Sequence, residues 1–156
     1  MRALVRRRHA QHPGGLASGQ LTALTPGQTA RGFLRHHPGF HAGRGRTPLI
    51  LIGAGTGVGP LVGMIRANHR LRPISLYFGL RNPDSDYLYR DELQAWLAEG
   101  RLAHLSLAVS RGAQPRYVQD ALRDEAEHVR AAIRQGAKIM VCGGREMAAG
   151  VTEALA

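Results

Sequence analysis

The chain has 156 residues, of which 44% are hydrophobic and one is a cysteine. This length suits one domain with a substantial core, while the single cysteine excludes an internal disulfide and fits a reducing, cytoplasmic location. The formal net charge of +10 is uneven: residues 1–46 contain eight arginines and no acidic residue and so carry +8, whereas residues 47–156 carry only +2. No apolar run approaches the roughly 20 residues of a membrane span, and the basic start lacks the apolar stretch of a signal peptide.

The first 46 residues do not have the pattern of a complete domain. Proline and glycine occupy turn positions at residues 25–28, and the Gly-, His- and Arg-rich residues 38–46 are typical of a linker. Short strands are predicted at residues 1–8, 20–24 and 29–34. Three such strands cannot bury a core, so we expect this region to be the end of something larger.

The arginine-rich start also raises the question of nucleic-acid binding. Clustered arginines attract phosphates, but residues 1–46 have few aromatic side chains for base stacking, and arginine richness often reflects only a GC-rich genome. We therefore expect no specific nucleic-acid partner. An anionic ligand or an acidic protein partner is the other reading of these charges.

From residue 47 onward, strands and helices alternate regularly. Strands are predicted at 49–53, 74–80, 103–109 and 138–142, and they are followed by helices at 60–70, 89–99, 117–135 and 145–155. The third helix places Val118, Ala121, Leu122, Ala126, Val129, Ala132 and Ile133 on one side, and Gly136 ends it. This alternation predicts an α/β fold, a doubly wound parallel sheet whose ligands lie at the carboxyl ends of the strands.

A glycine-rich turn follows the first predicted strand. Gly53, Gly55, Gly57 and Gly59 alternate with other residues, and Pro60 suits the first turn of the next helix. Such a turn lets backbone N–H groups approach a diphosphate at a helix N-terminus. It is neither a Walker A loop nor a clean GxGxxG fingerprint. Alone, it is as compatible with tight packing as with a nucleotide site.

Four ordered segments together resemble a known family. They read IGAGTGVGP, YFGLRNPDSDYLYRDEL, SR followed by RYVQDAL, and IMVCGGREMAAGV. In this order and spacing they are similar to the NADP(H)-binding domain of the ferredoxin–NADP reductase superfamily, especially its diflavin branch, such as the sulfite reductase flavoprotein subunit. The resemblance implies an NADPH-dependent flavoprotein oxidoreductase. Residues 47–156 then form the NADP(H)-binding domain without its C-terminal end, and residues 1–46 are a remnant of the flavin-binding β-barrel with its linker.

The resemblance also implies roles for individual residues. Ser110 and Arg111 bind the 2′-phosphate of NADP(H), and Arg116 substitutes for the family's lysine, whose position holds Pro115 here. Cys142 lies beside the nicotinamide carbon that carries the hydride, with no covalent thiol chemistry. The implied NADP(H) contacts are Gly53, Gly55, Thr56, Gly57, Pro60, Arg81, Ser110, Arg111, Arg116, Tyr117, Gly143 and Met147.

Simpler roles for these residues stay open. Ser110 is also a suitable helix N-cap, and Arg111 a solvated surface arginine. Cys142 fits a small buried hydrophobe. Arg81 has acidic neighbours with which to form a salt bridge, namely Asp84, Asp86 and Asp91.

A second implied cofactor is FAD. The segment GGLASG resembles the family's second FAD motif, so Gly15, Leu16, Ala17 and Ser18 are expected FAD contacts, although such a segment is equally a flexible loop. The family's first FAD motif and its C-terminal stacking aromatic do not occur in the 156 residues, so this chain is expected to bind FAD poorly or not at all.

The expected electron acceptor is an FMN- or flavodoxin-type domain, a haem protein or an iron–sulfur protein. The alternative is an NADP(H)-binding module without turnover, which needs another chain for the flavin barrel. We expect no metal site, because the histidines lack ligand spacing.

Overall fold

A computed structural model describes residues 16–33, 37–43, 45–69 and 71–156. The chain divides into two units, Met1–Pro38 and Gly39–Ala156. Phe40 and Ala42 pack against the core of the second unit. Both residues lie before residue 46, where the sequence predicts the boundary between the barrel remnant with its linker and the NADP(H)-binding domain. That boundary stays a prediction.

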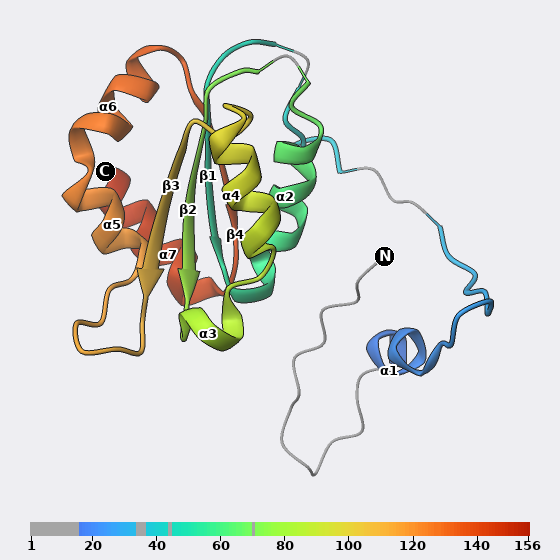
Figure 1. Ribbon diagram of the computed structural model, residues 1–156. Helices are drawn as coiled ribbons and strands as arrows, with labels where there is room; N and C mark the ends of the chain where they lie inside the picture. Colours follow the sequence, from blue (N-terminus) through green and yellow to red (C-terminus); the bar gives the residue numbers. More distant parts are fainter. Residues whose placement is uncertain (1–15, 34–36, 44, 70) are drawn as a thin grey trace. The chain divides into compact units, whose positions relative to one another are not determined.

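The second unit is built on one parallel sheet of four strands. Its strands are β1 (Leu49–Ala54), β2 (Ile74–Leu80), β3 (His104–Val109) and β4 (Lys138–Cys142), in the spatial order β3-β2-β1-β4 (Figure 1). All neighbouring strands are parallel, with Leu49 opposite both Ile74 and Lys138. The predicted α/β class, the strand positions and the parallel sheet are confirmed.

Helices cover both faces of this sheet, as the strand–helix alternation predicts. In Figure 1, α2 (Val58–Arg66) and α4 (Arg90–Ala98) lie on one side, and α5 (Val118–Asp124), α6 (Ala126–Arg134) and α7 (Arg145–Leu155) lie on the other. The short helices η1 (Gly55–Gly57) and α3 (Pro83–Asp86) follow the carboxyl ends of β1 and β2.

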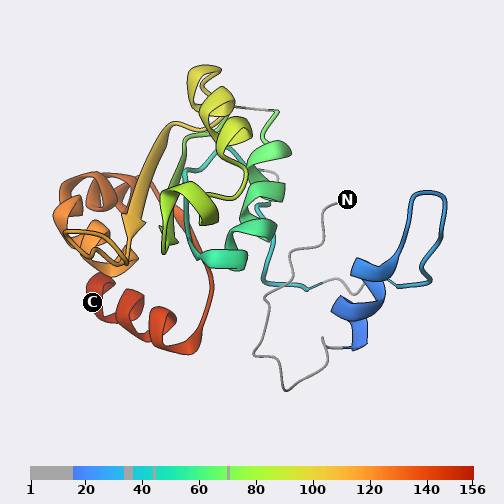
Figure 2. The ribbon, with the colours of Figure 1, turned by 60° about the horizontal axis from the view of Figure 1, so that its bottom comes forward.

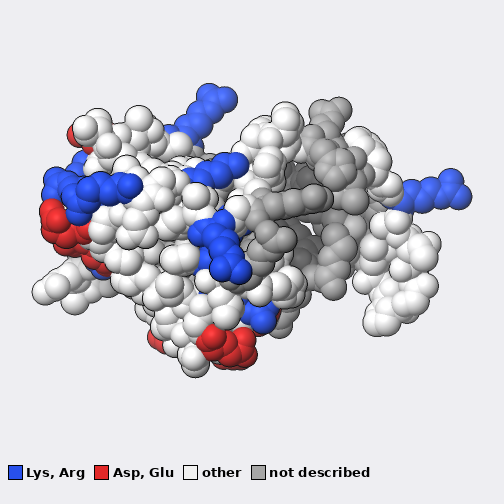
Figure 3. Space-filling model, turned by 90° about the horizontal axis from the view of Figure 1, so that it is seen from above, with Lys and Arg blue, Asp and Glu red and all other residues white. Residues whose placement is uncertain are grey.

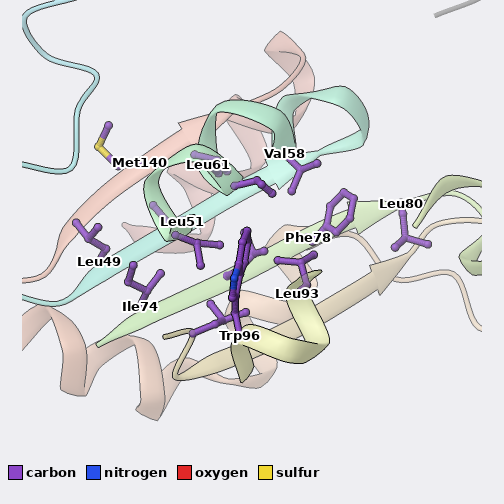
Figure 4. Packing of buried hydrophobic residues seen from close by; sticks show 14 residues of the cluster. Leu49, Leu51, Val58, Leu61, Ile74, Phe78, Leu80, Leu93, Trp96 and Met140 are labelled. Atoms are coloured by element: carbon purple, nitrogen blue, oxygen red, sulfur yellow. The ribbon is translucent and has the colours of Figure 1, made fainter. Parts of the chain in front are cut away.

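Alternate residues of each strand enter different cores. Leu49 and Leu51 of β1 face α2 and α4, where they pack with Leu61, Leu93 and Trp96 (Figure 4). Ile50 and Ile52 enter the core on the opposite face, under α5–α7. Because both faces of β1 are covered, its four residues from Leu49 to Ile52 are all apolar and at most 1% exposed.

The predicted helix at 117–135 is wrong in one respect, because it is two helices. Glu125 lies between α5 and α6 with φ −105° and ψ 27°, outside the helical region. The interruption changes the direction of the apolar side: Val118, Ala121 and Val129 are buried, but Ile133 is 43% exposed and does not belong to the core. Gly136 ends α6 with φ +79°, as predicted.

In the first unit, the predicted turn is confirmed and two predicted strands are wrong. The N–H of Gln28 donates to the carbonyl of Thr25 at 3.1 Å, and Gly27 takes φ +93°. Residues 20–23 belong instead to α1 (Leu16–Ala23), whose alanine, leucine and glutamine residues favour a helix. Residues 29–33 form no strand, and no partner strand exists in the described part of this unit. The prediction for residues 1–8 lies outside the described residues.

Candidate functional site

The carboxyl ends of the four strands meet at one edge of the sheet, which Figure 2 turns toward the viewer. Glycines allow the ends of β1 and β2 to approach closely. A Cβ built on Gly79 meets Ala54 Cβ at 3.3 Å and Val118 Cγ1 at 3.0 Å, and one on Gly53 meets Leu61 Cδ1 at 2.8 Å. Gly53 and Gly79 are therefore required for close packing of the strand ends. Gly55, with φ +54° and open space at its Cβ position, is instead required for the backbone conformation of the turn after β1.

Gly57 brings the turn after β1 against the end of β4. A Cβ on Gly57 collides with the carbonyl oxygen of Cys142 and lies 2.8 Å from its carbonyl carbon and 3.2 Å from Gly143 N. A Cβ on Gly143, in turn, collides with Met147 Cε. The turn after β1 and the end of β4 are thus in direct backbone contact. One corner of the site therefore brings together four of the predicted residues, Gly57, Cys142, Gly143 and Met147.

Ser110 and Arg111 lie directly after β3 and continue its pairing with β2. The N–H of Ser110 donates to Leu80 O at 2.9 Å, and the N–H of Arg111 donates to Arg81 O at 3.2 Å. The Ser110 hydroxyl also donates to Leu80 O, at 3.3 Å. Both residues therefore have a fixed backbone beside the end of β2.

Among the uncompensated cations of this edge are Arg81 and Arg111. Both are exposed, and neither forms an ion pair with any residue that the structure describes. The expected alternative, a salt bridge from Arg81 to Asp84, Asp86 or Asp91, is not formed. Asp86 instead accepts from the N–H of Asn82 and the hydroxyl of Ser85. Two free guanidinium groups at one sheet edge favour an anionic ligand.

Arg116 and Tyr117 end the loop that follows Arg111. The N–H of Arg116 donates to Val109 O at 2.8 Å, which folds the loop back onto β3. The Arg116 guanidinium is directed at two carboxylates, with Nε 3.1 Å from Asp124 Oδ2 and Nη2 3.4 Å from Glu125 Oε1. Tyr117 precedes α5 and is 54% exposed, so its ring is available to a ligand. Thr56 in η1 and Pro60 in α2 are exposed as well.

A polar network lies under α5 and α6, behind this loop. The Ser106 hydroxyl donates to Glu125 Oε1 at 2.6 Å, and His104 Nε2 donates to Glu125 Oε2 at 2.7 Å. The His104 ring lies against the His128 ring in a tilted arrangement, with centroids 4.5 Å apart, and Ser75 Oγ lies 2.8 Å from His128 Nε2. Burial raises the pKa of Glu125, but the hydrogen bonds from Ser106 and His104 outweigh it and leave that pKa below its usual value.

Tyr77 places a buried hydroxyl beside this network, where it has no hydrogen-bond partner among the described residues. Its side chain is fully buried, and its ring centroid lies 5.8 Å from that of His104. Burial, followed by the nearby Glu125 carboxylate, raises the pKa of Tyr77. Tyr77 is therefore neutral, and it lies beside the ionised Glu125.

The lowered pKa of Glu125 predicts a pH-dependent contribution to stability. The ionised carboxylate stabilises the fold above the pKa that it has in the unfolded chain, about 4.3, and this contribution is lost as the pH falls through the lower folded pKa. We expect Glu125→Gln to lower the free energy of unfolding by roughly 1.5 kcal/mol at neutral pH, with the difference from wild type shrinking in acid. Urea unfolding followed by the fluorescence of Trp96 at several pH values measures it.

A suitable control for this experiment is Glu127→Gln. Glu127 lies on α6 and is exposed, with one surface ion pair to Arg130. It should change stability little at any pH. A Glu125→Gln difference that stays constant from neutral to acid pH contradicts the linkage.

The family model for the oxidoreductase NAD-binding domain matches residues 51–153, which include β2, β3, β4, most of β1 and the whole carboxyl edge. Curated relatives are also similar to this chain. Human NADPH–cytochrome P450 reductase is 42% identical over 111 residues, and rat methionine synthase reductase is 37% identical over 127 residues. The chain belongs to the diflavin branch of the ferredoxin–NADP reductase superfamily. It is thus a member of an oxidoreductase family, as its four motifs predict.

The chain is short compared with these relatives. The match covers 65% of this chain and 16% of the human reductase, and 69% of this chain and 18% of the rat protein. It therefore spans about one sixth of the length of each relative.

Cys142 ends β4 within the segment IMVCGG, which resembles the family's sequence. The side chain is half-buried against the core under α2, and burial raises the pKa of its thiol. A thiol with a raised pKa stays protonated at neutral pH and is a poor nucleophile. This agrees with a role in lining a pocket rather than in covalent chemistry.

The expected FAD residues fall in the first unit. Gly15 lies outside the described residues, and Leu16, Ala17 and Ser18 lie at the beginning of the described part of α1. The expectation of FAD contacts stays a prediction, and the described part of this motif is helical.

The described residues contain neither a metal site nor a membrane-spanning helix. No group of three or more His, Cys, Asp or Glu side chains there is arranged to hold a metal ion. No helix in the described ranges is long and apolar enough to cross a membrane. On the face shown in Figure 3, lysines and arginines stand at separate positions, some of them beside acidic side chains.

Glu125 and the network around it were not predicted from the sequence. The available signal was the pair His104 and Ser106, two polar residues at alternate positions of a strand expected to be buried on both faces. Such residues need a partner on the covering helix, and Glu125 is the one acidic residue within the apolar side of the predicted helix.

Proposed function

We propose that this chain is the nucleotide-binding part of an NADPH-dependent flavoprotein reductase. It holds NADPH across the carboxyl edge of the sheet so that the nicotinamide can reach a flavin, FAD. Electrons then leave the flavin for a protein acceptor, an FMN- or flavodoxin-type domain, a haem protein or an iron–sulfur protein. The names of its relatives, NADPH–cytochrome P450 reductase and methionine synthase reductase, support this class of reaction.

The observation that carries the proposal is the order of chemical groups along the edge. Ser110 and the unpaired Arg111 follow β3, Arg81 follows β2, the glycine turn follows β1, and Cys142 ends β4. An extended dinucleotide laid across this edge meets a phosphate-binding group at one end, a close backbone approach in the middle and an uncharged thiol at the other end. This sequence of environments suits a 2′-phosphate, a pyrophosphate and a nicotinamide.

Each group then has a defined task. Arg111 and the hydroxyl of Ser110 bind the 2′-phosphate, and the exposed ring of Tyr117 covers the adenine or donates its hydroxyl to that phosphate. Gly53, Gly55, Thr56 and Gly57 present backbone N–H groups to the pyrophosphate, with Pro60 in the helix that follows and Arg81 adding charge. Cys142, Gly143 and Met147 shape the pocket for the nicotinamide, which supplies the hydride when the nucleotide is bound.

FAD is the second cofactor of the proposal. Leu16, Ala17 and Ser18 lie in α1 and belong to the segment GGLASG, which resembles the family's second FAD motif. We propose that they contribute, with Gly15, to FAD binding when the remaining flavin contacts are present.

The proposal is tested by comparing two nucleotides on the wild-type 156-residue chain. Isothermal titration calorimetry should give an affinity for NADP⁺ that is about tenfold or more above that for NAD⁺, because each charge-assisted hydrogen bond to the 2′-phosphate contributes roughly 1.5–3 kcal/mol. Adenosine 2′,5′-bisphosphate should compete with NADP⁺, and adenosine 5′-monophosphate should compete poorly. Equal affinities for NADP⁺ and NAD⁺ contradict the assignment.

A further inference from the structure

Glu125 is a carboxylate held in place by the sheet. It occupies the interruption between α5 and α6, and its side chain is 25% exposed. Each of its oxygens accepts a hydrogen bond from β3, Oε1 from Ser106 and Oε2 from His104. A carboxylate with both oxygens bound to one rigid strand has a fixed position and a fixed negative charge.

Arg116 connects this carboxylate to the loop of the candidate site. Its Nη2 lies 3.4 Å from Glu125 Oε1, its Nε lies 3.1 Å from Asp124 Oδ2, and its backbone N–H binds Val109. The end of the 110–117 loop is therefore fixed at two points, to β3 through the backbone and to the α5–α6 interruption through the side chain. Tyr117 follows immediately, so its position depends on the same two points.

Arg116 and Arg111 differ in their electrostatic surroundings. Two carboxylates already compensate the charge of Arg116, whereas Arg111 is exposed and forms no ion pair within the described ranges. A 2′-phosphate that approached the Arg116 guanidinium would also approach Asp124 and Glu125, which repel it. The geometry thus separates the two arginines into an anchor and a ligand.

We propose that Glu125 is a positioning residue that holds Arg116 and, through it, orders the 110–117 loop for nucleotide binding. Arg116 then supports NADP(H) and NAD(H) equally, and discrimination between them belongs to Arg111 with Ser110. This inference rests on the proposed function and replaces the expectation that Arg116 substitutes for a phosphate-binding lysine.

The test compares Glu125→Gln, Arg116→Ala and Arg111→Ala with the matched control Glu127→Gln. By calorimetry, Glu125→Gln and Arg116→Ala should each weaken NADP⁺ and NAD⁺ by the same factor, about two- to fivefold, which is the size of one partly exposed ion pair. The double variant should lose little more than Arg116→Ala alone, because both changes break one interaction. Arg111→Ala should weaken NADP⁺ only, and Glu127→Gln neither nucleotide.

A second measurement examines the loop without any nucleotide. In the free protein, the amide of Arg116 should exchange its hydrogen faster in Glu125→Gln than in wild type or Glu127→Gln, and Arg116→Lys should recover part of the affinity lost in Arg116→Ala. If Arg116→Ala weakens NADP⁺ alone, Arg116 is a phosphate ligand and the inference is overturned. Wild-type exchange rates and affinities in Glu125→Gln overturn it as well.

The two proposals fail in different ways. If wild-type protein binds neither nucleotide, the proposed function fails, and the exchange rates still decide whether Glu125 orders the loop. If NADP⁺ binds but Glu125→Gln behaves as wild type, only the positioning role is lost. Circular dichroism of each variant checks that a loss of nucleotide affinity does not come from unfolding.

Discussion

Gly57→Ala is expected to destabilise the fold and to remove nucleotide binding together. The added methyl group collides with the carbonyl oxygen of Cys142, and the atoms nearest to it all belong to the backbone, so no side chain can turn aside. Forcing an extra methyl group into a packed site costs about 1–3 kcal/mol, and relieving it here separates the β1 turn from β4. Urea unfolding should show that loss, and calorimetry should find NADP⁺ affinity lowered by at least about tenfold.

Gly63→Ala is the matched control for this change. Gly63 lies in α2, the next helix along the chain, and a Cβ built there meets no atom within 4 Å. Alanine is also the better helix former, so this variant should be as stable as wild type or more stable by up to about 1 kcal/mol. If Gly57→Ala proves as harmless as Gly63→Ala, the close contact between the turn and β4 is not essential to the site.

Arg111→Ala is expected to reduce NADP(H) affinity about tenfold or more and to leave NAD(H) affinity unchanged. Arg111 has a backbone fixed to Arg81 and no ion pair in the described part of the chain, so its charge is available to the one group that distinguishes the two nucleotides. Loss of one or two charge-assisted hydrogen bonds, at roughly 1.5–3 kcal/mol each, gives the expected factor. Calorimetry with both nucleotides measures it.

The control for Arg111→Ala is a second exposed arginine at the other end of the sheet. Arg134 lies in the last turn of α6, just before β4 begins, and therefore near the opposite edge. Arg134→Ala lowers the net charge by the same amount and should leave both affinities unchanged. Equal losses for NADP(H) and NAD(H) in Arg111→Ala would contradict a phosphate contact.

The sheet and its helices were predictable because their signals are local. Leu49 to Ile52 form an apolar run that only a strand covered on both faces requires, and Gly136 marks the end of a helix by its left-handed conformation. Parallel strands separated by helices also bring the four predicted strand ends to one edge without any knowledge of their contacts.

The features that sequence patterns missed depend on contacts between distant residues. The interruption at Glu125 joins a helix to Ser106 and His104, which are 19 and 21 residues away, so the apolar period alone predicted one helix instead of two. The strand predicted at 20–24 failed for a different reason. Its short apolar spacing fits either structure, and the helix-forming residues of α1 decide the outcome.

The arginine content, similarly, could not separate ligands from anchors. The sequence alone does not distinguish Arg81, Arg111 and Arg116 from one another. In the structure, Asp124 and Glu125 compensate the charge of Arg116, whereas Arg81 and Arg111 form no ion pair with a described residue.

Two-dimensional NMR of the ¹⁵N-labelled chain titrated with NADP⁺ tests the central claim most directly, because it locates the nucleotide on the protein. We predict that the amide signals of Gly55, Arg81, Arg111 and Gly143 shift together, while those of residues that begin the strands, Ile74, His104 and Lys138, do not. Shifts confined to the strand beginnings or to residues 16–33, with the carboxyl edge unchanged, would contradict the account.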